Sequence, residues 1–505
     1  MGAGPGDPDL ITARGIHRIQ QADIIFHDKL SPSELIEQYA PEDARVEDVG
    51  KRKGKVGPSQ DEINQKLVDA SKHYKRVVRL KGGDPYLFGR GGEEAEYLQS
   101  SGVSFEVVPG ISSLLSVPNY AGIPVTHRDY ASSLAVVTGH PGPRGETPNW
   151  QALSSIDTLV IMMGITRAGE ISQTLIEHGR SPETPVALIG WGTTPDQHTR
   201  MYTLGTLKDG VNNPSEVLPG LIVVGEVANL RSKLNWFESR PLFGKRIIVT
   251  RPSHQNQSIT RSLWEEGANP LCYPTIEIEP LETGLENLRE SCSQLDRFDW
   301  VIFTSRNGVR IFFDTLKETG RDTRALGSTR LATIGKRTAE KCVEYGCRAD
   351  FVPTTYQAED LAEGLLEKLI SPANILLPRA KGARKILPNQ LSNNGHTVKE
   401  IQIYESTPAA ERSRSGLESV FSEQTADMIT FTSASTVNHL FQMFSEKEQW
   451  LRSRLEGVET ACIGPITAGQ LQEKEISVDV VPDQYTVEHL LEAIRQHYAH
   501  TEGGT

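Results

Sequence analysis

The sequence RLKGGDPYLFGRGGEE, residues 79–94, begins at the end of an apolar run, continues through a turn with two glycines and ends where a helix is expected to start. A strand that passes through a glycine-rich turn into a helix is the repeating unit of α/β folds, whose ligands gather at the carboxyl ends of strands. Paired glycines let the backbone approach a ligand closely, and Asp84 can accept hydrogen bonds from a hydroxyl or an amine. Seen alone, Gly82 and Gly83 are equally compatible with a tight turn.

The first 236 residues repeat this unit. Helical stretches such as residues 61–74 alternate with strand-like runs, which are ADIIFHD, RVVRL, FEVVPG, LAVVTGH, TLVIMMG, PVALIG and GLIVVGEV. The segment NWFESRPLFGKR at 235–246 has no clean period and precedes a new strand, which predicts a junction between domains. We therefore expect an α/β domain over residues 1–236 and a linker over 237–244.

Everything after this junction repeats internally. KRIIVTRP matches NILLPRAKG, so that Arg251 and Arg379 occupy equivalent positions, and three more blocks recur in the same order at a spacing of about 128 residues. A period this long excludes a solenoid and predicts two similar α/β lobes with a ligand cleft between them. Each TS or IG pair in the repeat should lie where a strand passes into a helix, where it could bind a carboxylate. Plain helix N-caps are the structural alternative.

Composition and charge exclude several classes of protein. A chain of 505 residues should form two or three domains, and its net charge of −12 argues against a general nucleic-acid binder. No apolar run approaches the roughly 18 to 20 residues of a membrane span, and the first residues lack a secretory pattern, so we expect a cytoplasmic protein with no membrane partner. Five cysteines without CxxC spacing indicate buried thiols rather than disulfides or a zinc site, and we expect no metal.

The glycine-rich start GAGPGD at residues 2–7 does not fit a dinucleotide fingerprint. That fingerprint requires a third glycine three residues after the second, and Pro5 removes a backbone N–H from the turn.

Several motifs together nevertheless resemble one family. GAGPGDP, VGKRKG, RLKGGDPYLFGRGGEE, VVPGISS, YAGIPVTHRDYA and VTGH occur in the order and spacing of uroporphyrinogen-III C-methyltransferases, which are tetrapyrrole methylases. The repeated half is similar to uroporphyrinogen-III synthase. The resemblance implies an α/β fold with a bilobal methylase domain at 1–236, followed by a bilobal, internally duplicated synthase domain at 245–500. Its lobe one would comprise about 245–279 plus 408–500, and its lobe two about 280–407.

The resemblance to the methylases implies S-adenosylmethionine as the cofactor, bound between two lobes. The implied cofactor contacts are Pro5, Gly82, Gly83, Asp84, Leu87, Ser112, Ser113, Met163 and Gly192. Ser112 and Ser113 stand where the family has Thr-Ala, a change that backbone contacts tolerate. The family also has an apolar strand before GAGPGD, which we expect to be missing or replaced here.

The implied substrate, uroporphyrinogen, carries eight carboxylates, so this acidic chain must gather positive charge locally. KRKGK at 51–55, Arg90 and Arg128, next to His127, offer that charge. The planar fork of Arg90 suits a carboxylate, and Glu93 can accept from a pyrrole N–H. A solvated ion pair at a helix start is the structural alternative for these two residues.

Methyl transfer to a pyrrole carbon must be followed by loss of a proton. The family implies Asp28 in FHDKL as the proton acceptor, Lys51 as a proton donor and His140 in VTGH as a substrate contact. An aspartate with an ordinary pKa of about 3.9 is a weak base, so burial or a like charge should raise that pKa if the role is real. His27 replaces the family's usual tyrosine before the acid.

The substrate implied for the second half is hydroxymethylbilane, a linear tetrapyrrole. Loss of its hydroxyl and closure through a spiro intermediate invert the last ring, so catalysis should rest on holding the chain and stabilising charge. The family implies Tyr404 in IQIYEST as the acid, and packing at a hinge is the alternative for this residue. The implied carboxylate binders are Thr304, Ser305, Thr333, Thr432, Ser433 and Gly464.

The resemblance as a whole implies a bifunctional enzyme. It would cyclise hydroxymethylbilane to uroporphyrinogen III and then methylate C2 and C7, giving precorrin-2 for sirohaem or cobalamin. Its partners would be small tetrapyrroles and a second copy, as a homodimer through the methylase domain. Alternatively, the first half methylates another substrate, and the second half is a non-catalytic, two-lobed tetrapyrrole-binding module.

Overall fold

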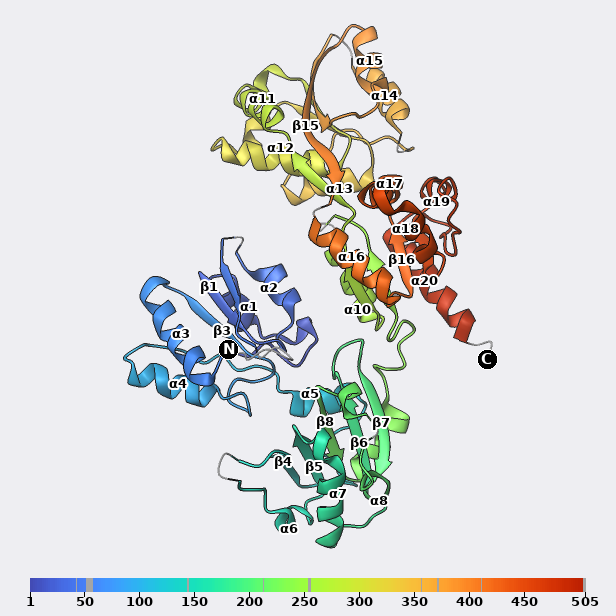
Figure 1. The fold of residues 1–505 in the computed structure, drawn as a ribbon. Helices are drawn as coiled ribbons and strands as arrows, with labels where there is room; N and C mark the ends of the chain where they lie inside the picture. Colours follow the sequence, from blue (N-terminus) through green and yellow to red (C-terminus); the bar gives the residue numbers. More distant parts are fainter. Residues whose placement is uncertain are drawn as a thin grey trace. The chain divides into compact units, whose positions relative to one another are not determined.

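The computed structural model describes residues 1–41, 43–50, 58–142, 145–211, 213–252, 256–355, 357–369, 372–409 and 411–502. The chain divides into two compact units (Figure 1). The first unit contains Met1–Arg246 with Arg261–Pro270 and the C-terminal end from Arg495, and the second contains Ile247–Thr260 with Leu271–Ile494.

The first unit begins with a three-stranded parallel sheet in the order β2-β1-β3. Its strands are β1 (Ile24–His27), β2 (Arg45–Asp48) and β3 (Val77–Leu80). The helices of this region are α1 (Ala13–Ile19), α2 (Ser33–Tyr39), α3 (Gln60–His73), α4 (Gly91–Ser100) and α5 (Ser113–Tyr120). Helix α3 begins at a capping box, in which Ser59 and Glu62 each bond the other's backbone N–H. Beside β3, Gly2 pairs with Lys81 and Gly4 with Gly83 through single bridges.

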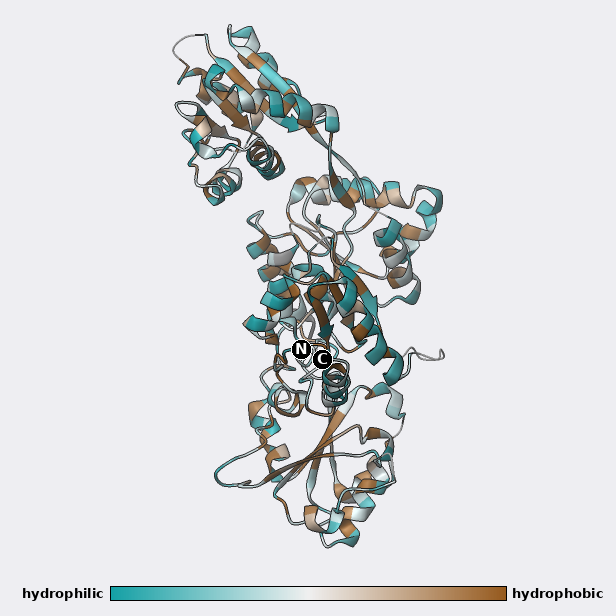
Figure 2. Cartoon of the chain, turned by 90° about the vertical axis from the view of Figure 1, so that its left-hand side faces the viewer, coloured by the Kyte–Doolittle hydropathy of each residue, from teal (hydrophilic) through white to brown (hydrophobic). Residues whose placement is uncertain are grey.

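A second, mixed sheet completes the first unit, in the order β4-β5-β8-β6-β7. Its strands are β4 (Leu134–Thr138), β5 (Thr158–Met162), β6 (Pro185–Gly190), β7 (His198–Thr203) and β8 (Gly220–Val224). Its helices are α6 (Trp150–Leu153), α7 (Ala168–Glu177), α8 (Leu204–Leu207) and α9 (Arg231–Leu234). Only β4 and β5 pair in parallel. All of β6 is buried, and Figure 2 shows hydrophobic residues concentrated in the strands.

Two more sheets belong mostly to the second unit. The sheet β10-β9-β16-β17 uses β9 (Arg246–Val249), β10 (Asn269–Cys272), β16 (Met428–Phe431) and β17 (Glu459–Cys462). The sheet β11-β15-β14-β12-β13 uses β11 (Ile276–Pro280), β12 (Trp300–Phe303), β13 (Arg330–Thr333), β14 (Asn374–Ala380) and β15 (Thr397–Pro408). Each sheet has its own apolar core. The copies of the internal repeat do not coincide with the sheets, because one sheet joins β9 of the first copy to β16 and β17 of the second, and the other joins β12 and β13 of the first copy to β14 of the second.

Helices cover both of these sheets. Those of the first sheet are α10 (Gln257–Glu265), α16 (Glu411–Glu423), α17 (Ala434–Met443), α18 (Glu448–Leu455), α19 (Pro465–Gln472) and α20 (Val487–Glu502). Those of the second are α11 (Glu282–Ser293), α12 (Arg306–Glu318), α13 (Lys336–Glu344), α14 (Ala358–Leu366) and α15 (Ile386–Asn393). The longest strand, β15, pairs in parallel with β14 and antiparallel with β11.

Two kinds of sequence expectation differ from this fold. The run FEVVPG does not form a strand; the backbone carbonyl of Val108 instead accepts one hydrogen bond, from the N–H of Gly2 at 3.0 Å. The expectation that the cysteines are buried is wrong for Cys272, which is exposed, and for Cys347, which is half-buried. Burial raises the pKa of Cys292, Cys342 and Cys462 to about 12, so these three thiols are poor nucleophiles.

Part of the segment predicted as a linker is firmly packed. Phe237 and Leu242 are fully buried. The carboxylate of Glu238 accepts hydrogen bonds from Gln197 at 2.8 Å and Thr199 at 2.6 Å, and it pairs with Arg231. These contacts attach the segment to the strand β7 and the helix α9 of the first unit.

Candidate active sites

Three glycine backbones meet at the turn after β3. A Cβ atom built on Gly110 or on Gly2 would overlap the carbonyl oxygen of Gly83, so neither position has room for a side chain. Gly83 has a φ of 65°, in the left-handed region that favours glycine. The segments GAGPGD, GGDP and VVPG therefore meet backbone to backbone, and Gly4 and Gly83 bond each other's peptide groups, with N···O distances of 3.4 and 2.6 Å.

Asp84 fixes this arrangement. One carboxylate oxygen accepts the N–H of Tyr86 at 2.9 Å, and the other accepts the N–H of Gly110 at 3.0 Å. The sequence suggested that Asp84 meets a ligand directly. In the structure its two bonds hold the GGDP turn closed and join that turn to the VVPG loop.

The other predicted cofactor residues lie at loop and helix ends. Ser112 is the N-cap of α5, and its hydroxyl accepts the N–H of Leu114 at 3.4 Å. Met163 follows β5, with 44% of its surface exposed. Pro5, Gly82, Leu87, Ser113 and Gly192 are half-buried.

Unusual backbone conformations gather in the same motifs. Among the described residues with a positive φ that are not glycine, five belong to motifs singled out from the sequence: Phe88, Arg90, Met163, Trp191 and Thr193. Such conformations cost about 1–3 kcal/mol each and cluster at functional sites. The strain supports a binding role for the loops FGRGG (88–92), IMMG (161–164) and GWGTT (190–194), the last of which contains the predicted contact Gly192.

Asp7, in the first glycine-rich turn, connects distant parts of the first unit. Its carboxylate accepts the hydroxyl of Tyr120 at 2.7 Å, and its N–H donates to the hydroxyl of Thr193 at 3.1 Å. Burial, followed by the charge of Asp7, raises the pKa of Tyr120. The turn is thereby anchored to α5 and to the GWGTT loop.

Replacing Tyr120 by phenylalanine should destabilise the first unit by about 1–3 kcal/mol, because buried Asp7 loses a donor. The folded-state pKa of Tyr120 is raised. The hydrogen bond therefore contributes fully to the free energy of unfolding below the ordinary tyrosine pKa of about 10, and this contribution is lost as the pH rises through the folded-state pKa. Thermal unfolding at pH 7 of the two proteins measures the difference. Identical midpoints would show that the bond contributes nothing.

Arg90 and Glu93 bind each other at the start of α4. The guanidinium donates from Nε at 2.9 Å and also from Nη2 to the two carboxylate oxygens, and both side chains are half exposed. The hydrogen bond between them raises the pKa of Arg90 and lowers that of Glu93. The solvated ion pair considered as an alternative is thus present, and a substrate carboxylate would have to exchange for Glu93.

We expect Arg90→Leu to eliminate methylation while the affinity for S-adenosylmethionine stays within roughly tenfold, about 1.4 kcal/mol. The reason is that Arg90 lies outside the contact between the glycine backbones. Calorimetry measures the affinity and product analysis the methylation. Arg200→Leu is a matched control, because Arg200 also pairs with a half-exposed glutamate, Glu216, at 2.8 Å. Loss of cofactor binding in Arg90→Leu alone would reverse the assignment.

Asp28 lies at the carboxyl end of β1 with 30% of its side chain exposed. Its Oδ1 accepts a hydrogen bond from Nη2 of Arg79 at 2.6 Å. The environment expected for a base, full burial or a neighbouring like charge, is not found, since its direct partner is a cation. His140 and Arg128 are exposed. Lys51 and the rest of KRKGK lie outside the described residues.

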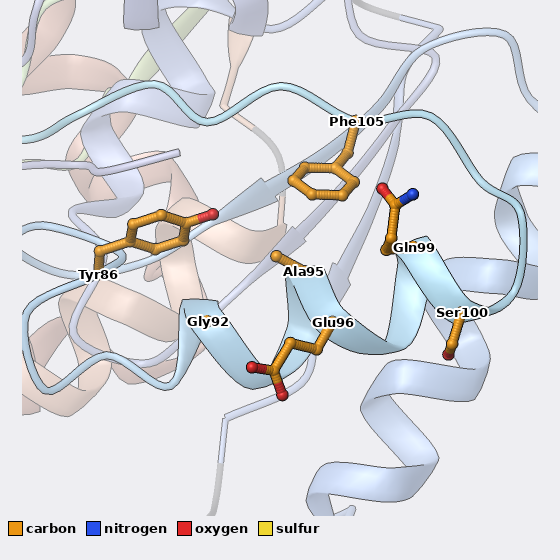
Figure 3. A pocket seen from close by; sticks show the side chains of 7 residues that line it. All are labelled: Tyr86, Gly92, Ala95, Glu96, Gln99, Ser100 and Phe105. Carbon is orange, nitrogen blue, oxygen red and sulfur yellow. The ribbon is translucent and has the colours of Figure 1, made fainter.

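A hollow of about 520 Å³ lies beside α4 (Figure 3). The residues that line it are Tyr86, Gly92, Ala95, Glu96, Gln99, Ser100 and Phe105. None of the predicted site residues is among them. This hollow is therefore distinct from the convergence of glycines.

In the second unit, Tyr404 meets Ser305. Their hydroxyl groups lie 2.8 Å apart, and the ring of Tyr404 is 5% exposed within an apolar core. The pairing of β14 with β15 shifts register between Arg379 and Ala380, so that Tyr404 stands opposite Ala380. Burial raises the pKa of Tyr404, while Ser305 and the charge of Arg379 act in the opposite direction. The phenol is therefore protonated at neutral pH.

The repeated TS and IG pairs lie where strands pass into helices, as predicted. Ser305 caps α12 by accepting the N–H of Gly308 at 2.9 Å, and Ser433 caps α17 by accepting that of Thr436 at 3.3 Å. Gly464 is the N-cap of α19. Thr304 and Thr432 are half-buried, whereas Thr333 is fully buried and its hydroxyl donates to the carbonyl of Gly335. Thr333 is thus poorly placed to bind a carboxylate with its side chain.

The internal repeat places Arg251 and Arg379 at equivalent positions, but the sequence did not predict that both are buried. Arg379 is 3% exposed, and its Nε and Nη1 have no hydrogen-bond partner among the described residues. Arg251, its equivalent in the repeat, is 6% exposed, and burial lowers its pKa to about 10. The one sequence signal for these two arginines was their equivalence in the internal repeat.

Neither a membrane-spanning helix nor a cluster of metal-binding side chains occurs among the described residues. In that part of the chain, no helix is long and apolar enough to cross a membrane. No three His, Cys, Asp or Glu side chains within the same ranges are grouped to hold a metal ion.

The chain matches two protein families in succession. Residues 1–208 match the tetrapyrrole (corrin/porphyrin) methylases, and residues 257–492 match uroporphyrinogen-III synthase HemD. Over 496 residues, 98% of this chain, it is 35% identical to the porphyrin biosynthesis protein HemD of Ruminiclostridium josui, of which 96% is covered. It is 40% identical over 329 residues to a uroporphyrinogen-III C-methyltransferase of Bacillus subtilis (strain 168), covering 65% of this chain and 67% of that protein.

A uroporphyrin-III C-methyl transferase from Thermus thermophilus, complexed with S-adenyl homocysteine, is 35% identical to the part of the chain that it matches. The match covers 46% of this chain and 97% of that one, with a TM-score of 0.40. The two family matches and the near full-length relative confirm the resemblance drawn from the motifs. The chain therefore belongs to the bifunctional tetrapyrrole biosynthesis enzymes, in which a tetrapyrrole methylase is followed by a uroporphyrinogen-III synthase.

Proposed function

We propose that the chain catalyses two consecutive steps. Its second half cyclises hydroxymethylbilane to uroporphyrinogen III with inversion of ring D. Its first half then methylates C2 and C7 of that product with S-adenosylmethionine and releases precorrin-2, for sirohaem or cobalamin synthesis. The observation that carries the proposal for the first half is the backbone contact between Gly2, Gly83 and Gly110. Asp84 holds it in place through its hydrogen bonds from Tyr86 and Gly110, which we call the Asp84 brace.

The glycine convergence fits a cofactor with many polar atoms. Gly82 and the backbone around Pro5 would present peptide groups, and Met163 offers an exposed apolar side chain. Gly83, whose peptide groups bond those of Gly4, would give the turn its shape. S-adenosylmethionine supplies the methyl group when it is bound. The remaining contacts would come from Asp84, Leu87, Ser112, Ser113 and Gly192. Asp84 would act by holding the turn in shape.

The substrate would lie over the other loops of the first unit. Arg90 would exchange Glu93 for a substrate carboxylate, which releases Glu93 to accept from a pyrrole N–H. Asp28 would take the proton that leaves the methylated carbon, on Oδ2, while Arg79 holds Oδ1. His140 and Arg128, both exposed, would contact the substrate periphery. Lys51 would donate a proton.

In the second half, catalysis would rest on Tyr404 and on helix N-termini. The protonated phenol can assist departure of the substrate hydroxyl, and the hydroxyl of Ser305 can donate a hydrogen bond to the phenolate as it forms. Backbone N–H groups at the starts of α12, α17 and α19 can bind substrate carboxylates. The residues proposed there are Thr304, Ser305, Thr432, Ser433 and Gly464. Thr333, which precedes α13, is not included, because its N–H donates to the carbonyl of Phe351 at 3.0 Å and its hydroxyl to that of Gly335.

Domain limits, assembly and location belong to the proposal as well. We place the methylase domain at 1–236 and the synthase at 245–500, with a homodimer formed through the methylase domain. Sedimentation of the full chain tests the dimer. We also place the protein in the cytoplasm, where thiols stay reduced.

Product analysis tests the two steps together. The full chain is given hydroxymethylbilane with and without S-adenosylmethionine. We expect uroporphyrinogen III without the cofactor and precorrin-2 with it. Uroporphyrinogen I alone would contradict the synthase and favour a tetrapyrrole-binding module. Uroporphyrinogen III that stays unmethylated with cofactor present would favour a methylase for another substrate.

A further inference from the structure

A chain of four charged side chains runs from the interior of the first unit to Asp28. Oε1 of Glu94 accepts hydrogen bonds from Nζ of Lys81 at 2.7 Å and from Nε of Arg79 at 3.3 Å. Nη2 of Arg79 donates to Oδ1 of Asp28 at 2.6 Å. Gln60 of α3 adds a further hydrogen bond to Glu94, at 3.2 Å.

These groups are buried to a degree that is unusual for charges. The side chains of Lys81 and Glu94 are each 5% exposed, and that of Arg79 is 11% exposed. Buried charges persist only when they are paired and hydrogen-bonded, and here two cations meet two carboxylates. Of these four side chains, only that of Asp28, which is 30% exposed, reaches the protein surface. The buried members cannot meet a ligand directly, so any effect on chemistry must pass through Asp28.

The four residues also join separate elements. Arg79 belongs to β3, Lys81 directly precedes the turn at Gly82 and Gly83, and Glu94 belongs to α4. The neighbouring Glu93 instead points outward to Arg90. The two glutamates of FGRGGEE therefore serve different purposes, and the second one faces the interior.

We propose that Lys81 and Glu94 are positioning residues for methyl transfer. They fix the guanidinium of Arg79, which in turn holds the carboxylate of Asp28 in one orientation at the end of β1. The inference rests on the proposed function, in which Asp28 accepts the proton. Without this support, Asp28 could rotate away from the methylated carbon, and a misplacement of about 1 Å can cost roughly 100-fold in rate.

The test uses the full chain with preformed uroporphyrinogen III and S-adenosylmethionine, so that synthase activity does not enter. The double variant Lys81→Met with Glu94→Leu removes one cation and one carboxylate together and keeps the charge balanced. We expect kcat to fall about 10- to 100-fold, while KM for both substrates stays within about threefold. Combined with Asp28→Asn, the double variant should add no further loss beyond about threefold, because both changes act on the same group.

A matched control is the pair Arg231 and Glu238, whose side chains are 13% and 12% exposed in the same unit. Arg231→Met with Glu238→Leu should lower the thermal midpoint without lowering kcat. Arg79→Lys is a second variant, because an ammonium group cannot bond both carboxylates as the guanidinium does; it should lower kcat about as much as the double variant.

The outcomes separate this inference from the proposed function. A wild-type kcat in the double variant or in Arg79→Lys, with Asp28→Asn impaired, would overturn the positioning role alone. Losses that multiply when Asp28→Asn is added would also overturn it, because the two sites would then act independently. A full rate in Asp28→Asn would overturn the acceptor assignment, and the positioning role with it.

Discussion

Asp84→Ala is expected to abolish detectable binding of S-adenosylmethionine while the synthase half stays folded. The carboxylate accepts backbone N–H groups of Tyr86 and Gly110, and alanine can accept neither. The VVPG loop would then lose its connection to the GGDP turn, and the two N–H groups would lose their acceptor in the protein. Gly83→Val should have the same effect for a different reason. Space is available there, since the nearest atom to a Cβ is 3.8 Å away, but a φ of 65° strains a β-branched residue.

Calorimetric titration of the full chain measures this effect, and circular dichroism checks the fold. Asp157→Ala is a matched control, because Asp157 also accepts two backbone N–H groups, those of Ser132 and Ser133, both at 2.9 Å. We expect Asp157→Ala to lose stability and to keep its cofactor affinity. An Asp84→Ala protein that binds as tightly as wild type would refute the role of the brace.

Apolar patterns predicted the interior of the fold well. Four of the predicted runs contain the largely buried strands β1, β5, β6 and β8, because buried strands must be continuously apolar. The edge strand β2 has the sequence RVED and the edge strand β7 has HTRMYT. Both are largely or partly exposed, so polar residues are tolerated and no apolar run marks them. FEVVPG shows the converse, since an apolar run without a neighbouring strand forms no ladder.

The sequence predicted those features of the candidate sites that depend on residues close together in the chain. The repeat located the helix N-caps Ser305 and Ser433 because capping depends on residues two or three positions away. The role of Asp84 depends on Gly110, 26 residues further on, and that of Glu94 on Arg79 and Lys81 of another element. Arg79, Lys81 and Glu94 do belong to one motif, but their pairing depends on how the chain folds back from the end of β3 to α4, and the motif alone does not show which of its two glutamates faces the interior.

Tyr404→Phe should slow formation of uroporphyrinogen III by roughly 10- to 1000-fold if the phenol assists loss of the substrate hydroxyl. Phenylalanine preserves the ring in its apolar core and removes only the hydroxyl that lies 2.8 Å from Ser305. Ser305 keeps its bond from Gly308, so the loss of stability should be about 0.5–1.5 kcal/mol. A large kinetic effect with a small change in thermal midpoint would therefore indicate chemistry rather than packing.

The isomer ratio makes this measurement direct, because uncatalysed closure of hydroxymethylbilane gives the type I isomer, whereas inversion of the last ring requires a held chain. The full chain without cofactor is assayed beside Tyr345→Phe, which removes another tyrosine hydroxyl of the second unit, one that donates to Asp314 at 3.1 Å. Tyr345→Phe should keep the wild-type rate and isomer ratio, whereas Tyr404→Phe should shift the product toward type I as spontaneous closure overtakes the slowed enzyme. A full rate in Tyr404→Phe would leave Tyr404 as hinge packing, and catalysis would then rest on the helix N-termini that bind the substrate carboxylates.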